Sequence, residues 1–120
     1  MAMLAMDVPP PQTAPAPPAR MLAFADEFRF DASRDVVPAG VLILQVKNIG
    51  EDDHDLRIKG PNGVARAETG KVKPGDLGQI RIRLPQGRYT YLCTVADHAE
   101  KGMTGTLLVR AVKKKKRPRR

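Results

Sequence analysis

The chain has 120 residues, enough for one domain with a modest core and too few for two. Its net charge of +8 points at first to a nucleic-acid or membrane partner, but seven of the 21 basic residues lie in KKKKRPRR, residues 113–120. Residues 1–112 carry 14 basic and 13 acidic residues, so the body of the chain is almost neutral. The single cysteine excludes a disulfide framework within the chain and a structural zinc site built on several thiolates.

Proline is concentrated near the start of the chain. Six of the 11 prolines lie between Pro9 and Pro18, and this composition favours an extended polyproline conformation over a packed one. We interpret residues 1–19 as a leader or linker, 20–112 as the folded domain and 113–120 as a basic disordered tail. The chain has no run of about 18 apolar residues, so we expect no membrane-spanning segment. Its first residues do not form a complete signal peptide.

After the proline-rich segment, short stretches of alternating polarity are separated by turn signals. This pattern predicts an all-β Greek-key sandwich of about seven or eight strands. In the first stretch, LAFADEFRF, we expect a bulge or an exposed end at Asp26. The residues expected to share one face of that stretch are Leu22, Phe24, Phe28 and Phe30.

The next stretches follow the same period of two. DVVPAG predicts a short strand or turn, and VLILQVKN predicts a strand with Gln45 and Lys47 outward. GPNG and KPGD are typical of turns, with a loose stretch at 64–70 between them. QIRIRL then predicts a strand, and TGTLLVRAV the last one. The residues expected to face inward in the two clearest stretches are Leu42, Leu44, Val46, Ile80, Ile82 and Leu84.

Two chemically active side chains are expected at inward-facing strand ends. HDLRIK places His54 on the same side as Leu56 and Ile58, and RYTYLC places Cys93 on the same side as two tyrosines. If these strand ends lie at one pole of the sandwich, the two side chains meet. The thiol of Cys93 alone is compatible with a free thiol, a metal ligand or a bond to another chain.

The loop that follows Cys93 adds two further donors. It reads CTVADHAEKGM, so that His98 and Met103 follow the cysteine at regular spacing. A thiolate, two imidazoles and a thioether form a ligand set that suits copper in both of its oxidation states. We therefore expect one copper ion at this pole, although zinc accepts the same set. The acidic segment EDDHD around His54 is interpreted as a solvated loop.

These segments resemble the copper-binding segments of the cupredoxins, the superfamily of plastocyanin and azurin. The resemblance is carried by NIGEDDHDL, KPG and GRYTYLCTVADHAEKGMTGTLLV, and the Cys-x4-His-x4-Met spacing is similar to that of rusticyanin-like and auracyanin-like members. It implies a type 1 copper site with His54, Cys93 and His98 as strong ligands and Met103 as the axial ligand.

The resemblance also implies roles for neighbouring residues. We expect the backbone N–H of Asp55 to donate to the sulfur, and its carboxylate to accept from Thr94 and so to brace the two loops. Asp97 stands where many relatives have a Pro-Gly turn, and its charge should favour Cu(II). We expect electrons to pass at the exposed edge of His98, beside Ala99.

The expected function is that of a one-electron carrier between a redox donor and a redox acceptor, with copper delivery or storage as the alternative. An enzyme is not expected, because two histidines are too few for a trinuclear copper cluster. Residues 113–120 would suit an anionic membrane surface or an acidic protein, and no aromatic residue accompanies them to stack on nucleic-acid bases. The chain is expected to be a monomer and, by the resemblance, extracytoplasmic, periplasmic or at the cell surface.

Overall fold

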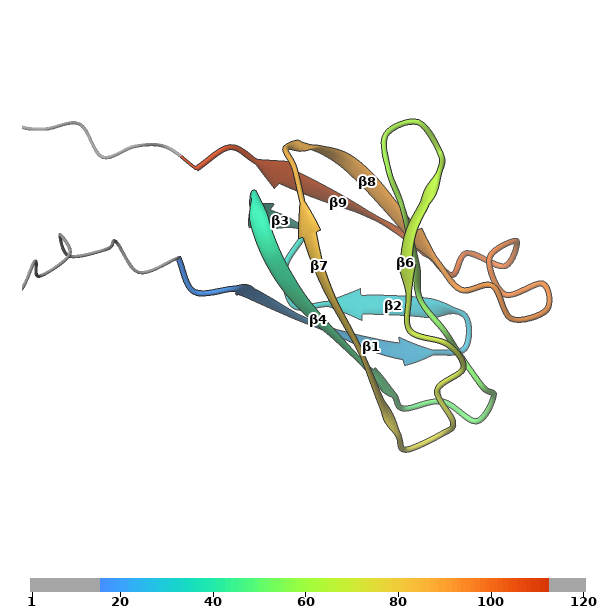
Figure 1. Ribbon diagram of the computed structural model, residues 1–120. Coiled ribbons are helices and arrows are strands. Elements are labelled where there is room, and N and C mark those ends of the chain that lie inside the picture. The colour runs from blue at the N-terminus through green and yellow to red at the C-terminus, as the bar shows by residue number, and fades with distance from the viewer. Residues whose placement is uncertain (1–15, 113–120) are drawn as a thin grey trace, which may run out of the picture.

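The structure is a computed structural model that describes residues 16–112. The expected tail and most of the expected leader, at 1–15 and 113–120, lie outside the described residues. Within the described part, nine β-strands form two sheets that pack as a sandwich (Figure 1). The predicted all-β sandwich is confirmed, with one strand more than the higher number expected. No helix in residues 16–112 is long and apolar enough to cross a membrane.

The first sheet has the strand order β2-β1-β4-β7. β1 pairs in parallel with β4, and the other two pairings are antiparallel. In β4 the inward set Leu42, Leu44 and Val46 is buried while Gln45 and Lys47 are half-buried, as predicted. The four strands are β1 (Ala19–Asp26), β2 (Arg29–Ala32), β4 (Gly40–Asn48) and β7 (Leu77–Leu84).

The second sheet has the strand order β3-β9-β8-β5-β6. β3 is at its edge, where the missing N–H of Pro38 costs no hydrogen bond between strands. The ring of Tyr89 is buried and its hydroxyl donates to the carbonyl of Pro85, so the predicted core position of this tyrosine is confirmed. The five strands are β3 (Val36–Pro38), β5 (Arg57–Lys59), β6 (Ala65–Glu68), β8 (Gly87–Leu92) and β9 (Thr104–Arg110).

The inner faces of both sheets contribute to one core. It contains Ile80 and Leu84 of β7 and both tyrosines of β8, while the third predicted inward residue of β7, Ile82, is half-buried and packs against it. The core extends to the side chains of Cys93 and Met103 at one end of the sandwich. The candidate ligands are therefore part of the packed interior. The largest fully buried side chains of this core include Tyr89, Leu42, Leu44, Leu56, Ile58, Leu84, Met103 and Leu107.

The predicted face of the first strand is wrong. Met21, Ala23 and Ala25 are buried, whereas Leu22 is half-buried and Phe24 is 38% exposed. From Met21 to Ala25 both alternating sets are apolar, so the period of this short run does not decide which set faces the core. β1 ends at Asp26, as expected, and the chain turns into β2. The rings of Phe28 and Phe30 then pack partly against the core.

The loose stretch expected at 64–70 contains a short strand. β6 pairs with β5 at the edge of the second sheet, and an ion pair between Arg57 and Glu68 with an N–O distance of 2.8 Å lies across the two strands. The sequence ARAE has little β-branched or aromatic content, so its pattern gave no strand signal. Pairing with the neighbouring strand decides its conformation.

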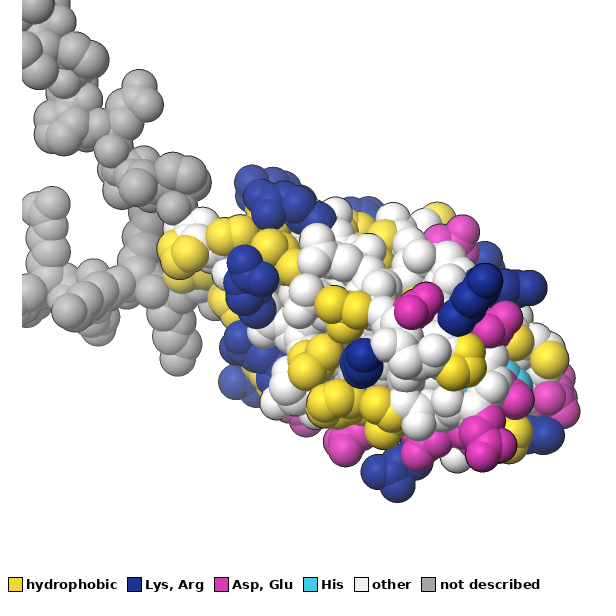
Figure 2. Space-filling model, turned by 90° about the horizontal axis from the view of Figure 1, so that it is seen from below, with side chains coloured by type: hydrophobic (Ala, Val, Ile, Leu, Met, Phe, Trp, Pro, Cys, Tyr) yellow, Lys and Arg dark blue, Asp and Glu magenta, His cyan; other side chains and the backbone are white. Residues whose placement is uncertain are grey.

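The two ends of the sandwich differ. The described chain enters and leaves at one end, and the loop between β8 and β9 extends from the opposite end (Figure 1). On the face seen in Figure 2, acidic side chains gather at the end away from the termini, and basic side chains lie nearer the termini. The candidate ligands belong to the acidic end.

Candidate metal centre

His54 is placed by a loop that a buried asparagine organises. The side-chain amide of Asn48 donates to the carbonyls of Asp52 and Val72, at 2.8 Å each, and its oxygen accepts from the N–H of Gly50. The backbone of His54 then pairs with Val72 through two hydrogen bonds. These contacts fix the segment before β5, so that the imidazole of His54 is fully buried.

Cys93 and Met103 close the base of the loop between β8 and β9. The N–H of Cys93 donates to the carbonyl of Met103 at 3.1 Å, directly beyond the last pair of the two strands. Inside the loop, the N–H of His98 donates to Val95, and the N–H of Met103 donates to the carbonyl of His98. The loop therefore curls back on itself and directs His98 toward the sulfur.

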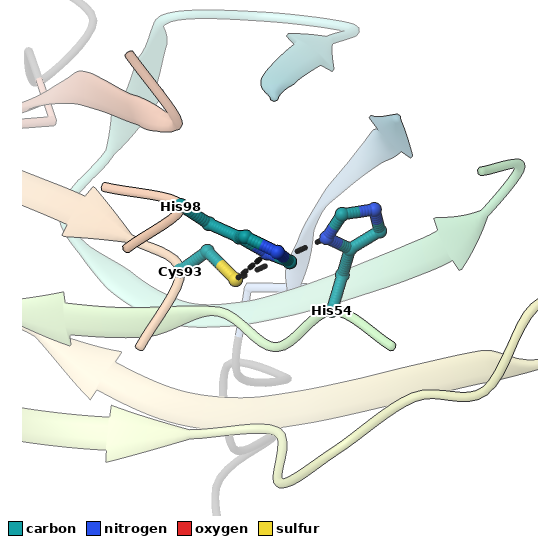
Figure 3. A group of neighbouring side chains, drawn as sticks. All are labelled: His54, Cys93 and His98. Carbon is teal, nitrogen blue, oxygen red and sulfur yellow. Dashed lines mark hydrogen bonds between the residues drawn. The ribbon is translucent and has the colours of Figure 1, made fainter. Parts of the chain in front are cut away.

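Three buried donors from these two segments meet at one point (Figure 3). The Sγ atom of Cys93 lies 3.6 Å from Nδ1 of His98 and 4.0 Å from Nδ1 of His54, and all three donor atoms lie within 4.8 Å of one another. Nitrogen and sulfur ligands at ordinary bond lengths around one ion are separated by about 3.5–3.7 Å. The spacing and the chemistry of the three donors thus fit a single metal ion.

Met103 lies beside this cluster and is fully buried. Its backbone is hydrogen bonded to both Cys93 and His98, so the thioether belongs to a residue held at the base of the site. The four residues that the spacing and the resemblance single out are therefore brought to one end of the core. A buried soft donor set of this kind suits a metal that takes thiolate and thioether ligands.

The environment of the thiol favours its neutral form as long as no cation is present. Burial raises the pKa of Cys93, and the nearby charge of Asp55 acts in the same direction. Hydrogen bonds from the backbone of Asp55 and Val95 oppose this rise, which agrees with the expected donation from the Asp55 N–H. A bound cation would compensate for the cost of burying the thiolate.

The predicted contact between Asp55 and Thr94 is present. The carboxylate of Asp55 accepts the N–H of Thr94 at 2.5 Å and also the Thr94 hydroxyl. Asp55 is only 5% exposed, so the acidic segment around His54 is not wholly the solvated loop that its composition predicts. The reason is tertiary: the N–H and hydroxyl donors of Thr94 replace the water that the carboxylate loses on burial.

Asp97 is exposed, and its charge has a nearby counterion. Its carboxylate lies 3.6 Å from the ammonium group of Lys101, in an ion pair between two solvent-exposed side chains. The lysine offsets part of the field that Asp97 would exert on a bound cation. We therefore expect the charge of Asp97 to favour Cu(II) only weakly.

His98 reaches the surface only along a narrow edge, since 4% of the residue is exposed. The ring of Phe28 lies against it, with 4.9 Å between the ring centroids, and the ammonium of Lys101 lies over the outer face of Phe28. The carboxylate of Asp52 lies 3.4 Å from Nε2 of His98. Ala99, next in the chain, is half-buried. Phe28 therefore covers much of the surface at which electron transfer was expected.

The loop also contains a residue in an unusual backbone conformation. Ala96 has a φ of 44°, in the left-handed region that residues with a Cβ rarely adopt. It precedes Asp97 in the loop that leads to His98. The turn that brings His98 back toward Cys93 is formed here at a cost in backbone energy.

The sequence pattern did not predict one contact at the site, between Glu27 and His54. Oε1 of Glu27, in the turn between β1 and β2, lies 3.1 Å from Nε2 of His54. Hydrogen bonds from the backbone, of which that from Asp52 has the largest effect, lower the pKa of Glu27 to about 2. Glu27 is one of several acids in the chain and matches no motif, so no local signal identifies it.

No family profile matches the chain, and no curated protein does. Among solved structures, auracyanin A of the green thermophilic photosynthetic bacterium Chloroflexus aurantiacus, a blue copper protein, is 19% identical over 78% of this chain and all of its own, with a TM-score of 0.65. The dithionite-reduced auracyanin of Roseiflexus castenholzii is 20% identical over 77% of this chain and 95% of its own, with a TM-score of 0.62. Rusticyanin of Thiobacillus ferrooxidans is 21% identical over 76% of each chain, with a TM-score of 0.63. The fold is therefore that of the cupredoxins, and the predicted likeness to auracyanin and rusticyanin is confirmed.

Proposed function

We propose that this chain is a mononuclear type 1 copper protein that carries one electron between redox partners. The observation that carries the proposal is the buried cluster of Cys93, His54 and His98, whose donor atoms are spaced for one ion. Met103 is proposed as the weak axial ligand. The fold supports the proposal because its neighbours include auracyanin A, which is a blue copper protein.

The chemistry follows from the donor set and from its rigidity. Copper bound here would supply a one-electron couple, since imidazole and thiolate stabilise Cu(II) while thiolate and thioether accommodate Cu(I). The chain's contribution is to hold its donors in place. The backbone of His54 is hydrogen bonded to that of Val72, and the backbone N–H of Cys93 is hydrogen bonded to the carbonyl of Met103. Donors that are fixed before the ion arrives need little rearrangement when its charge changes.

The burial of the donors favours the carrier role over copper delivery or storage. A delivery module must release its ion readily, whereas Cys93 and His54 are 1% and 0% exposed. The proposed carrier is therefore expected to keep its copper through repeated reduction and oxidation. We do not propose an enzymatic activity, because two histidines do not provide for a second copper centre.

The place of action and the partners follow from this function. We propose an extracytoplasmic location and redox proteins as donor and acceptor, with electron transfer at the edge of His98 beside Ala99. The carboxylate of Asp52 lies beside this edge, and on the face seen in Figure 2 acidic side chains gather at the end away from the termini, which suits a partner with a basic surface. The basic segment 113–120 would add attraction to an anionic membrane or an acidic protein.

A visible absorption spectrum during titration with Cu(II), followed by ascorbate, tests the proposal. We expect an intense blue band that bleaches on reduction, returns on oxidation and is absent in Cys93→Ser. Retention of the copper against a chelator through several such cycles supports the carrier role, and ready loss supports delivery. A folded wild-type protein that gains no blue band with copper, or that takes up zinc alone, contradicts the proposal.

A further inference from the structure

The outer nitrogen of His54 faces a carboxylate from another part of the sandwich. Nε2 of His54 lies 3.1 Å from Oε1 of Glu27, while Nδ1 on the opposite side of the ring faces Cys93. The histidine side chain is fully buried and that of Glu27 is 26% exposed. The imidazole is thus held between a carboxylate and the thiol.

The other partners of Glu27 decide which nitrogen of His54 carries the proton. The backbone N–H groups of Glu51 and Asp52 both donate to the same Oε1, at 2.7 Å each. An oxygen that receives two backbone donors is acting as an acceptor, so its third partner must also be a donor. Nε2 of His54 therefore carries the hydrogen, and Nδ1 keeps its lone pair directed toward the candidate metal position.

The backbone leaves room for this carboxylate at one position. A Cβ added at Gly50 would collide with the side-chain carboxylate of Glu27. Gly50 does not have a positive φ, so a glycine is needed here for space and not for an unusual backbone conformation. The segment 50–52 therefore forms a cradle for the Glu27 carboxylate: Gly50 leaves room for it, and the N–H groups of Glu51 and Asp52 donate to it.

The same cradle connects Glu27 with the second imidazole. Asp52, whose N–H donates to Glu27, places its own carboxylate 3.4 Å from Nε2 of His98. Glu27 thus contacts one candidate ligand directly and holds the loop that contacts the other. Both imidazoles have a carboxylate behind them and present Nδ1 to the sulfur.

We propose that Glu27 is a positioning residue that fixes the Nε2–H tautomer of His54 and lowers the reduction potential of the bound ion. Ligating histidines whose second nitrogen donates to a carboxylate are held in orientation and become stronger ligands. The negative charge behind the ring also stabilises the more highly charged oxidation state. The statement on the potential rests on the proposed copper function, whereas the statement on the tautomer does not.

The first test uses the metal-free, full-length chain. Nitrogen-15 NMR of the histidine rings at about pH 8, above the ordinary range of imidazole titration, distinguishes the two neutral tautomers. We expect His54 of the wild type to carry its proton on Nε2. Gly50→Ala retains the charge of Glu27 but displaces its carboxylate, so a mixture of tautomers is expected in that variant. A wild-type His54 that is protonated on Nδ1, or on both nitrogens, overturns the proposal.

The second test uses the copper-loaded chain and the variants Glu27→Gln and Glu51→Gln. Each variant removes one negative charge from the same region, but the Glu51 side chain is exposed and makes no hydrogen bond or ion pair with any of residues 16–112. We expect Glu27→Gln to keep the blue band, raise the reduction potential and weaken Cu(II) binding by about 10- to 100-fold. Glu51→Gln is expected to change both quantities much less.

The outcomes separate the two proposals. Equal potentials and affinities for the two variants overturn the role of Glu27, while a blue wild-type protein leaves the copper function intact. A wild type without a blue band overturns the copper function, and the NMR result then decides the role of Glu27 alone. If Glu27→Gln does not fold, the wild-type tautomer and Gly50→Ala still decide it.

Discussion

The carboxylate of Asp55 binds two polar groups of Thr94, a residue 39 positions away in the chain. Asp55 follows His54, and Thr94 follows Cys93, so the contact joins the two segments that carry the cluster. It lies almost wholly out of solvent, since Asp55 is 5% exposed. The relative position of the imidazole of His54 and the thiol of Cys93 depends on this contact.

Asp55→Ala is expected to lower the free energy of unfolding of the metal-free protein. The substitution leaves a partly buried N–H and a hydroxyl of Thr94 without their acceptor, which costs about 1–3 kcal/mol. Chemical denaturation followed by circular dichroism measures the loss. Asp53→Ala, which removes a charge from the same segment, is the control and should change stability by less than about 0.5 kcal/mol. Equal losses in the two variants would show that the contact contributes nothing specific.

Met103→Leu is expected to separate packing from ligation. Leucine fills nearly the same volume in the core, so the metal-free protein should lose less than about 1.5 kcal/mol of stability. If the thioether is the weak axial ligand, the copper protein keeps its blue band and its reduction potential rises, because Cu(II) loses a donor. Voltammetry measures this shift. Leu107→Met, a reverse exchange in the same core, is the control, and an unchanged potential in Met103→Leu would argue against axial ligation.

Phe28→Ala is expected to speed the loss of copper to a chelator. The ring of Phe28 covers His98, and an aromatic pair of this type contributes about 0.5–1.5 kcal/mol, which corresponds to about a twofold to tenfold faster release. Phe24→Ala removes an exposed phenylalanine from the outer surface of β1 and should leave the release rate unchanged. The decay of the blue band after addition of chelator gives both rates. Identical decay in the two variants would mean that Phe28 does not limit access to the ion.

Ala96→Gly is expected to stabilise the protein. Glycine adopts the φ of 44° observed for Ala96 without the steric cost of a Cβ, and after its greater loss of backbone entropy the net gain is about 0.5–1 kcal/mol. Ala99→Gly, in the same loop without a positive φ, should instead lower stability by about 0.5–1 kcal/mol. Thermal unfolding of the metal-free variants compares the two. A loss of stability in Ala96→Gly would contradict the strain at this position.

Sequence predicted the fold best where one alternating set was polar. In β7 the exposed Arg81 and Arg83 left no choice of inward face, and Ile80 and Leu84 are buried as expected. In the middle of β1, from Met21 to Ala25, both sets are apolar, and the inward face is established only when the strand pairs in parallel with β4, a distant part of the chain. Periodicity contains no information about such a pairing.

The candidate site also has residues that the sequence predicts and residues that it does not. Cys93, His98 and Met103 lie on one loop, so their spacing alone suggested a common role, and the inward register of His54 added the fourth. Glu27 gave no such signal, because its role comes from a turn between strands that folding brings against the loop at 50–52. Local motifs predicted the donors, and only tertiary structure reveals what holds them.

The hydrogen bond between the N–H of Cys93 and the carbonyl of Met103 closes the ligand loop at its base. Its two ends are joined at the base, where β8 and β9 already pair, so the sandwich does not depend on how many residues lie between them. Insertions or deletions inside the loop would alter the ligand spacing without changing the register of the sheet. Evolution can therefore vary the metal chemistry through the length of this loop while the strand pairing is retained.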